Sequence, residues 1–458
     1  LLLRSSSLLA AAPAAAGPDP RLLAFCSREA PEVFHAVASA SQIYEPDPFD
    51  VERIHAEARD VFARALERVV DPGRTDPGRI LLLLGESGSG KTHLMRAFRN
   101  TVHQRRLGMV GYLQMTVGAE DYARYVVGRL VDSLQQPHAR PEVEQSSLTC
   151  LSDALAELLE PFDRASLCED DLGDSGLGVF VQQQADYLLS RPGFEAVHPD
   201  VIRALLYLQR RDPPITSRVV KFLRCEPLSP YEQQRLGSLA PWSAAPERML
   251  TAIAHLLSVT GQGALVLLVD QLEDLQNQEG STARFLRALD VMRHLVEECP
   301  STLVVLACLE EFYHVHRTAL PGPVRDRVER DPEVHRLATH RDADEVEALI
   351  ARRLEVLYES MHVRFREDEP LFPFTREELA ELSQERTRDV LDRCRLHQAR
   401  SAAAGALADW SHEPSGPAVA SPALDAQWND HLASFGASVP DDDGALAALL
   451  ARSIADLE

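Results

Sequence analysis

Residues 85–92 read GESGSGKT, a complete G-x-x-x-x-G-K-T pattern. Glycines at these spacings let successive backbone N–H groups converge on phosphate oxygens at the positive end of the following helix. Lys91 can then reach the β- and γ-phosphates as a compact point charge, and the Thr92 hydroxyl can bind Mg²⁺. The pattern therefore predicts a nucleotide site with ATP and Mg²⁺ as cofactors. The predicted contacts are Gly85, Glu86, Ser87, Gly88, Ser89, Gly90, Lys91 and Thr92.

Lysine is scarce in this chain. Of 47 basic residues, two are lysines, Lys91 and Lys221, and the others are arginines. Because the guanidinium group is planar and bulkier, arginine cannot simply replace the lysine of a phosphate loop. The identity of Lys91 therefore supports the phosphate site. Lys221 lies near Arg218 and Arg224, a group that fits either a nucleic-acid contact or, more simply, a solvated helix face.

A second set of polar residues follows the apolar run at 264–269. A site of this kind needs a carboxylate at the end of a neighbouring strand to hold Mg²⁺, and we predict that Asp270 and Thr92 are the metal ligands. Glu273 is the first candidate, and Asp274 the second, to polarise the attacking water. The plainer alternative is a buried strand that ends in a polar turn.

Four short apolar runs predict buried parallel strands at 80–84, 109–115, 264–269 and 302–308. Helical patterns alternate with them, and the first one covers residues 50–69 with Asp50 as its N-cap. This alternation predicts an α/β fold, a three-layer parallel-sheet P-loop core.

The spacing of the motifs predicts the domain organisation. Thr92 and Asp270 are far apart for a compact core, and the sequence between them contains helical patterns but no convincing strand. Such insertions often determine partner specificity. We predict a disordered or poorly defined extension (1–40), a core (41–139 and 261–337), a helical insertion (140–260), a helical lid (338–410), and an acidic linker with a terminal helix (411–458).

The phosphate loop, Asp270 and the helical region after residue 338 resemble the AAA+ and STAND branch of P-loop ATPases, which includes bacterial regulatory and phage-defence ATPases and is similar to origin-recognition AAA+ proteins. The resemblance covers about residues 40–405, apart from the insertion. It implies an enzyme that hydrolyses ATP to ADP and phosphate, with ATP bound between core and lid. It also implies catalytic roles for Lys91, Asp270 and Glu273.

The resemblance implies further site residues. In LPGPVRDRVERDPEVHRL, Arg327 is the first and Arg325 the second candidate for an arginine finger that completes a neighbour's site. Arg388 matches the lid arginine that pairs with the γ-phosphate. Ile43 and Tyr44 lie where relatives line the adenine pocket. Cys308 occupies the position where the family usually has Asn, Thr or Ser near the γ-phosphate, which is a departure from the family pattern.

The order of residues after the metal-binding acid departs from many AAA+ motors, because Gln271 rather than Glu follows Asp270. The D-Q-L-E-D order looks more like STAND signalling ATPases. It implies slow hydrolysis and a nucleotide-controlled conformational and assembly switch that orders the lid and an oligomer interface. The alternative is a DNA-engaged AAA+ ATPase similar to origin-recognition or transposition-regulator proteins. A small-molecule P-loop kinase is a third, weaker reading.

The chain has a formal net charge of −23, which argues against coating DNA or an anionic membrane by bulk charge. Scattered cysteines without a C-x-x-C pair are typical of a reducing compartment. No apolar run approaches the ~18 residues that span a bilayer. We therefore expect a cytoplasmic protein. The resemblance implies a homo-oligomer, and we expect a protein partner at the insertion or the tail. The first residues fit a disordered extension better than a signal peptide.

Overall fold

The computed structural model describes residues 18–35, 40–71, 73, 75–116, 119, 121–138, 145–168, 173–239, 242, 245–277 and 280–410. Residues up to Ala408 belong to one compact unit, and Asp409 begins a second. The helix expected near residue 450 lies outside the described residues. None of the described helices is long and apolar enough to cross a membrane.

The core is a five-stranded parallel sheet in the order β2-β3-β4-β1-β5. All four predicted strands are confirmed, and the fifth was not predicted because two residues carry no periodic pattern. The strands are β1 Arg79–Leu84, β2 Gly108–Gln114, β3 Ala264–Asp270, β4 Thr302–Cys308 and β5 His335–Arg336.

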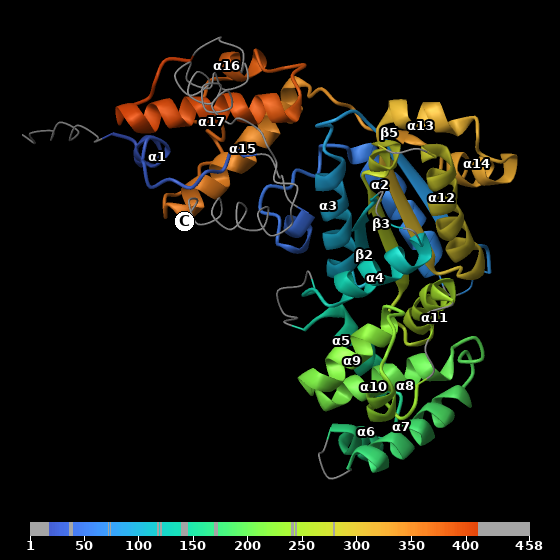
Figure 1. Cartoon of the computed structure of the whole chain (residues 1–458). Coiled ribbons are helices and arrows are strands. Elements are labelled where there is room, and N and C mark those ends of the chain that lie inside the picture. The colour runs from blue at the N-terminus through green and yellow to red at the C-terminus, as the bar shows by residue number, and fades with distance from the viewer. Residues whose placement is uncertain are drawn as a thin grey trace, which may run out of the picture. The chain divides into compact units, whose positions relative to one another are not determined.

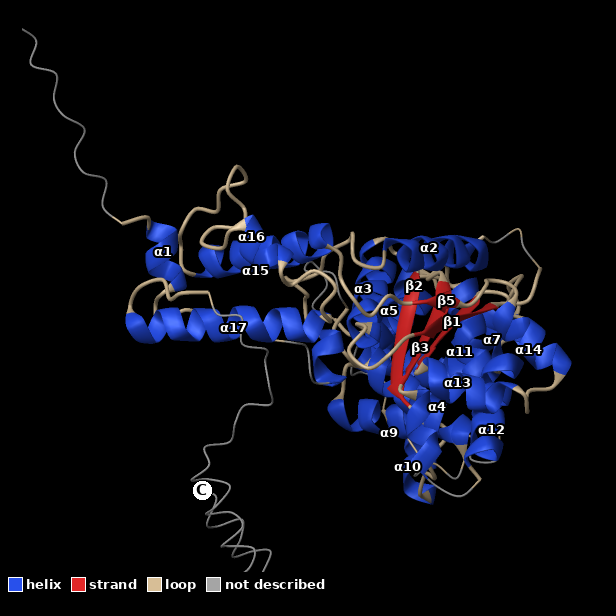
Figure 2. Cartoon of the chain, turned by 90° about the horizontal axis from the view of Figure 1, so that it is seen from above, coloured by secondary structure: helices blue, strands red, loops and turns tan. Residues whose placement is uncertain are grey.

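Helices cover both faces of the sheet (Figure 2). Side chains alternate along β1: Leu81 and Leu83 pack with α2 (Ala56–Val70) and α3 (Lys91–Gln104), whereas Leu82 packs on the opposite face. That face is covered by α4 Tyr122–Leu134, α11 Pro246–Val259 and α12 Ser281–Glu298. The predicted three-layer α/β fold is therefore observed. The short helices α13 Glu310–Arg317 and α14 Gly322–Glu329 follow β4.

The first core helix begins later than predicted. α2 starts at Ala56, and His55, in a left-handed conformation, precedes it. Asp50 is not the N-cap, because its carboxylate accepts hydrogen bonds from the Arg59 guanidinium at 2.6 and 3.1 Å. Because α2 begins only at Ala56, residues 49–55 are outside the helix, and several of them line the cavity described below.

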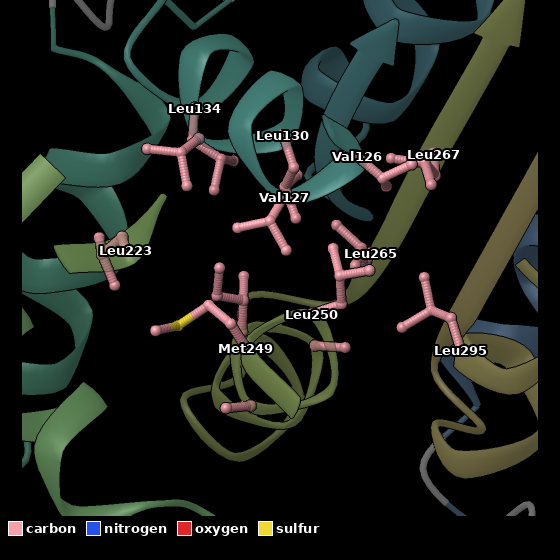
Figure 3. Packing of buried hydrophobic residues seen from close by; sticks show 14 of the residues in the cluster. Val126, Val127, Leu130, Leu134, Leu223, Met249, Leu250, Leu265, Leu267 and Leu295 are labelled. Carbon is pink, nitrogen blue, oxygen red and sulfur yellow. The ribbon is translucent and has the colours of Figure 1, made fainter. Parts of the chain in front are cut away.

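The described residues between α4 and α11 fold into helices and short turns. These are α5 Ser147–Ala156, α6 Pro161–Cys168, α7 Asp174–Leu189, α8 Pro199–Tyr207, α9 Pro213–Leu223 and α10 Pro230–Arg235. Figure 3 shows how they join the core: Val127 and Leu130 of α4 lie between Leu223 of α9, Met249 of α11 and Leu265 of β3. One continuous apolar cluster thus connects these helices to the sheet.

Three helices follow the sheet: α15 Ala343–Ser360, α16 Arg376–Ala380 and α17 Thr387–Ala404. A further helix, α1 Pro20–Phe25, lies beside them (Figure 1). Phe25 is fully buried, with its ring 5.5 Å from that of Phe374, and Arg21 pairs with Glu369 at 2.6 Å. Residues 18–35 therefore pack with the helices of the predicted lid region, called the lid below, whereas the extension over 1–40 was predicted to be disordered or poorly defined.

Candidate functional site

The phosphate loop connects β1 to α3, and its backbone requires glycine at two positions. Gly88 and Gly90 have φ values of +83° and +96°, a region that side chains strongly disfavour. Gly90 immediately precedes α3, so the loop amides and the helix N-terminus face the same point. A Cβ on Gly85 would lie 2.6 Å from Ser89 Oγ, so a side chain does not fit there either.

The two predicted metal ligands are brought together from positions far apart in the sequence. Thr92 Oγ1 donates a hydrogen bond of 2.6 Å to Asp270 Oδ2, and the Gln271 N–H donates to Oδ1 at 2.9 Å. Asp270 is almost fully buried. Lys91 Nζ donates to the Gly85 carbonyl at 2.9 Å. A hydroxyl and a carboxylate oxygen side by side are hard ligands suited to Mg²⁺, so the residues present fit that ion.

A residue that the sequence analysis missed also holds this carboxylate. The Tyr112 hydroxyl donates to Asp270 Oδ2 at 3.2 Å from the neighbouring strand β2. Burial, together with the charge of Asp270, raises the pKa of Tyr112, so the phenol remains protonated and can donate. Only the pairing of β2 with β3 reveals this contact, because no motif marks Tyr112.

The chain turns sharply after Asp270, and this turn places Glu273. Gln271 has a left-handed φ of +56°, and Glu273 then reaches the cavity wall. Glu273 Oε2 accepts a hydrogen bond of 3.1 Å from the Leu309 N–H, just beyond β4. Burial raises the pKa of Glu273 above its usual value. Asp274 is not among the residues that line the cavity.

These groups form one wall of a cavity of about 290 Å³. The lid supplies the opposite wall, including the exposed side chain of Arg388 at the start of α17. Arg388 has no carboxylate partner within the described part of the chain. Its place on the wall agrees with the predicted location of the lid arginine. The remaining wall residues from outside the phosphate loop include Phe49, Val51, Ile54, Leu349, Thr387 and Leu391.

Several predicted site residues lie elsewhere. Ile43 is buried in the apolar cluster between the sheet and α2, and the Tyr44 hydroxyl lies 2.8 Å from Ser133 Oγ, so neither lines the cavity. The segment several residues further on, which includes Phe49, takes that place. Cys308 is also fully buried, and burial raises the pKa of its thiol, so the side chain does not reach the cavity.

The candidate arginine fingers are outside the cavity of their own chain. Arg327 lies on α14, is partly exposed, and has its guanidinium 3.9 Å from Glu297. Arg325, on the same helix, does not line the cavity either. Within one chain, therefore, neither arginine has access to the nucleotide site.

The second lysine is engaged inside the fold. Lys221 Nζ, on α9, pairs with Glu232 at 2.9 Å. Arg224 forms an ion pair with Asp132 of α4. These contacts tie α9 to α10 and α4, so they explain both cations without nucleic acid.

Arg341 is a further residue that no sequence motif indicated. It lies between β5 and α15, is 1% exposed, and contributes to the cavity wall. Its Nη2 donates to the Ser89 carbonyl at 3.0 Å, and its Nε donates to Thr387 Oγ1 at 2.8 Å. Burial lowers the pKa of this guanidinium, but it stays charged, because an arginine begins from a very high value. Arg341 therefore connects the phosphate loop to the lid.

Comparison with known proteins agrees with this geometry. A family model described as AAA ATPase domain matches residues 58–305, which is more than half of the chain and includes the phosphate loop, Asp270 and Glu273. No curated protein matches the chain. With its parallel sheet, phosphate loop and paired Thr92 and Asp270, the chain belongs to the AAA ATPase domain family, and its core is a nucleotide-binding P-loop ATPase domain.

Proposed function

We propose that this protein is a Mg²⁺-dependent regulatory ATPase of the STAND type, in which ATP acts as a conformational and assembly switch. The observation that carries the proposal is the shared cavity: the phosphate loop and Glu273 form one side, and Arg388 of the lid forms the other. A ligand that fills this cavity touches both bodies, and it can therefore shift the lid through its differential contacts.

The residues have distinct roles in this proposal. Lys91 and the loop amides bind the β- and γ-phosphates, and Thr92 and Asp270 would hold Mg²⁺, which neutralises charge on the phosphates when bound. Glu273 orients the attacking water and accepts its proton. Because Glu273 is already bonded to the Leu309 N–H, its carboxylate is held in place but only partly available. This arrangement favours slow turnover.

The assembly part of the proposal rests on Arg327. The side chain is partly exposed, and its nearest carboxylate, Glu297, is at 3.9 Å, too far for a hydrogen bond. A partly exposed, loosely paired arginine is available to a neighbouring subunit's nucleotide. Light scattering with ADP, ATP and a non-hydrolysable analogue tests this role. Nucleotide-dependent assembly that Arg327→Ala abolishes supports it, and a constant monomer refutes it.

Nucleotide binding and hydrolysis are tested with two substitutions. Lys91→Ala is expected to eliminate ATP binding in calorimetry, because no other lysine can supply the point charge. Glu273→Gln is expected to retain ATP binding and to lower turnover by about 10²-fold or more, whereas Asp274→Asn serves as the matched control with near-normal turnover. Unchanged ATP affinity in Lys91→Ala would refute the site.

The DNA-engaged alternative has less support. Two of its three predicted cations, Lys221 and Arg224, already pair with carboxylates within the fold, and Arg218 lies over the Tyr231 ring. A salt-titrated shift assay decides between the two functions. ATP-dependent DNA binding would favour the alternative, and absence of binding at low salt would remove it.

A further inference from the structure

Two residues in the segments that connect the lid and the core contact the same atom. His55 ends the segment 40–55, which precedes α2 and has already packed on the core at Ile43, and Arg341 lies in the connection from β5 to α15. His55 Nε2 lies 2.7 Å from the carbonyl oxygen of Ser89, and Arg341 Nη2 lies 3.0 Å from it. Ser89 belongs to the phosphate loop and is fully buried.

His55 is held in an unusual backbone conformation for this contact. Its φ of +58° is left-handed, which is uncommon for a residue with a side chain and has an energetic cost. Burial, with the charge of Arg341, lowers the pKa of His55 to about 3, so the imidazole is neutral. The Ser89 oxygen can only accept, so in the tautomer that makes this hydrogen bond the neutral ring donates its Nε2–H, and the 3.1 Å approach of Arg341 Nη2 to the same nitrogen is then a contact between two donors.

Arg341 extends the connection to the lid helices. Its Nε donates to Thr387 Oγ1 at 2.8 Å at the first residue of α17, and its backbone N–H donates to the Glu385 carbonyl at 3.0 Å. On the side of the sheet, Nη2 also donates to the Ala338 carbonyl at 2.8 Å. The fork of one guanidinium therefore fixes the distance between the loop carbonyl and α17, which a flexible ammonium could not do.

Arg341 is also incompletely satisfied in its buried position. Nη1 is buried without a hydrogen bond, and the nearest carboxylate, Glu345, is 3.6 Å away. A buried charge with a distant partner favours an anion nearby, and Arg341 lies on the wall of the cavity that the phosphate loop serves.

We propose that Ser89, His55, Arg341 and Thr387 form a coupling junction, through which a nucleotide phosphate at the loop sets the orientation of the lid. The inference rests on the proposed function, since it needs a nucleotide in the cavity. Phosphate recruits the loop amides and the Lys91 ammonium, which now donates to the Gly85 carbonyl. The resulting movement of the loop is passed through the Ser89 carbonyl to both connections. His55 and Arg341 act here as positioning residues.

Two substitutions separate this junction from nucleotide binding itself. Arg341→Lys keeps the charge but cannot reach Ser89 and Thr387 together. His55→Gly keeps the left-handed backbone and removes only the imidazole. His362→Gly is the matched control, because His362 has a similar φ of +56° in the lid but is exposed and far along the chain from the junction.

The readout is hydrogen exchange of α15 and α17 with and without MgATP, beside ATP affinity from calorimetry. Wild type and His362→Gly are expected to gain protection in both helices on binding. In Arg341→Lys and His55→Gly the gain in protection is expected to fall by about tenfold or more. Each variant loses a hydrogen bond to the buried Ser89 carbonyl, and the loss of such a bond has an effect of this size. Protection is compared at saturating MgATP for each protein, so that a change in ATP affinity, to which Arg341 on the cavity wall can contribute, does not enter the comparison.

The outcomes distinguish the two proposals. If wild type does not bind ATP, the proposed function fails, and the junction fails with it. If wild type binds ATP and its lid responds, but both variants respond equally, then only the junction is refuted. Should Arg341→Lys not fold, as its thermal melt would show, His55→Gly alone decides the matter, because it leaves the buried guanidinium in place.

Discussion

Replacing Phe25 by alanine tests whether the N-terminal segment belongs to the lid. The Phe25 ring is fully buried, 5.5 Å from the ring of Phe374 in an edge-to-face pair and 5.9 Å from that of His397 on α17. These contacts join residues more than three hundred positions apart in the sequence. Removing the ring leaves a cavity under α17, and α17 begins at Thr387 on the wall of the nucleotide cavity.

The expected cost follows from the burial. Truncation of a fully buried Phe to Ala lowers the free energy of unfolding by about 3–5 kcal/mol. Because the edge-to-face ring pair is also lost, we take a value in the middle of this range, about 4 kcal/mol. A lid with an unfolding free energy of about 5 kcal/mol would keep about 1 kcal/mol and stay mostly folded. Nucleotide affinity would then change by less than about twofold, whereas amide exchange through lid opening would accelerate by about a thousandfold.

Hydrogen exchange is therefore the assay that resolves the effect, measured on α15 and α17 without nucleotide. Leu23→Ala is the matched control, because Leu23 lies on the same short helix but is 56% exposed, and its loss should cost within about 0.5 kcal/mol. Exchange in Phe25→Ala that stays within about threefold of wild type would contradict the packing described here. Equal acceleration in both variants would mean that α1 as a whole, and not the buried ring, is what matters.

Three further predictions concern the nucleotide site. Tyr112→Phe removes a hydroxyl that orients Asp270 and should raise the Mg²⁺ concentration for half-maximal ATPase activity by about tenfold; Tyr125→Phe, whose hydroxyl donates to a backbone carbonyl instead, should not. Arg388→Met should weaken ATP more than ADP in calorimetry, since the lid arginine is expected at the γ-phosphate, and equal losses would place it elsewhere. Chelation of Mg²⁺ should remove most of the thermal stabilisation that ATP gives, and full stabilisation in EDTA would argue against the metal site.

The sheet and the phosphate site were predictable because each is encoded within a few neighbouring residues. Apolar runs such as 264–269 have the length and composition of a buried strand, and the loop at 85–92 needs glycine for its backbone and lysine for its charge. The pairing of Thr92 with Asp270 also followed, since parallel strands end at the same edge of the sheet.

The parts that were not predicted depend on contacts between distant segments. Tyr112 reaches Asp270 only because β2 pairs with β3, and Arg341 acquires its role only when the lid folds over the loop. The packing of Phe25 on the lid is of the same kind. The family resemblance implied that Ile43 lines the cavity. Because α2 starts later than predicted, residues further along the chain, such as Phe49 and Ile54, line it instead.

The helices between α4 and α11 and the lid differ in the kind of contact that joins each of them to the core. The helices between α4 and α11 share a continuous apolar cluster with the sheet, whereas neither apolar cluster includes a described residue after Leu337. The lid instead meets the core through polar groups: the coupling junction, and exposed ion pairs such as Arg386 with Glu86 at 3.4 Å and Arg53 with Asp344 at 2.5 Å. Exposed pairs contribute about 0–1 kcal/mol each. The proposed movement of the lid therefore breaks polar contacts and neither of these two apolar clusters, whereas a movement of the helices between α4 and α11 would break a continuous apolar cluster.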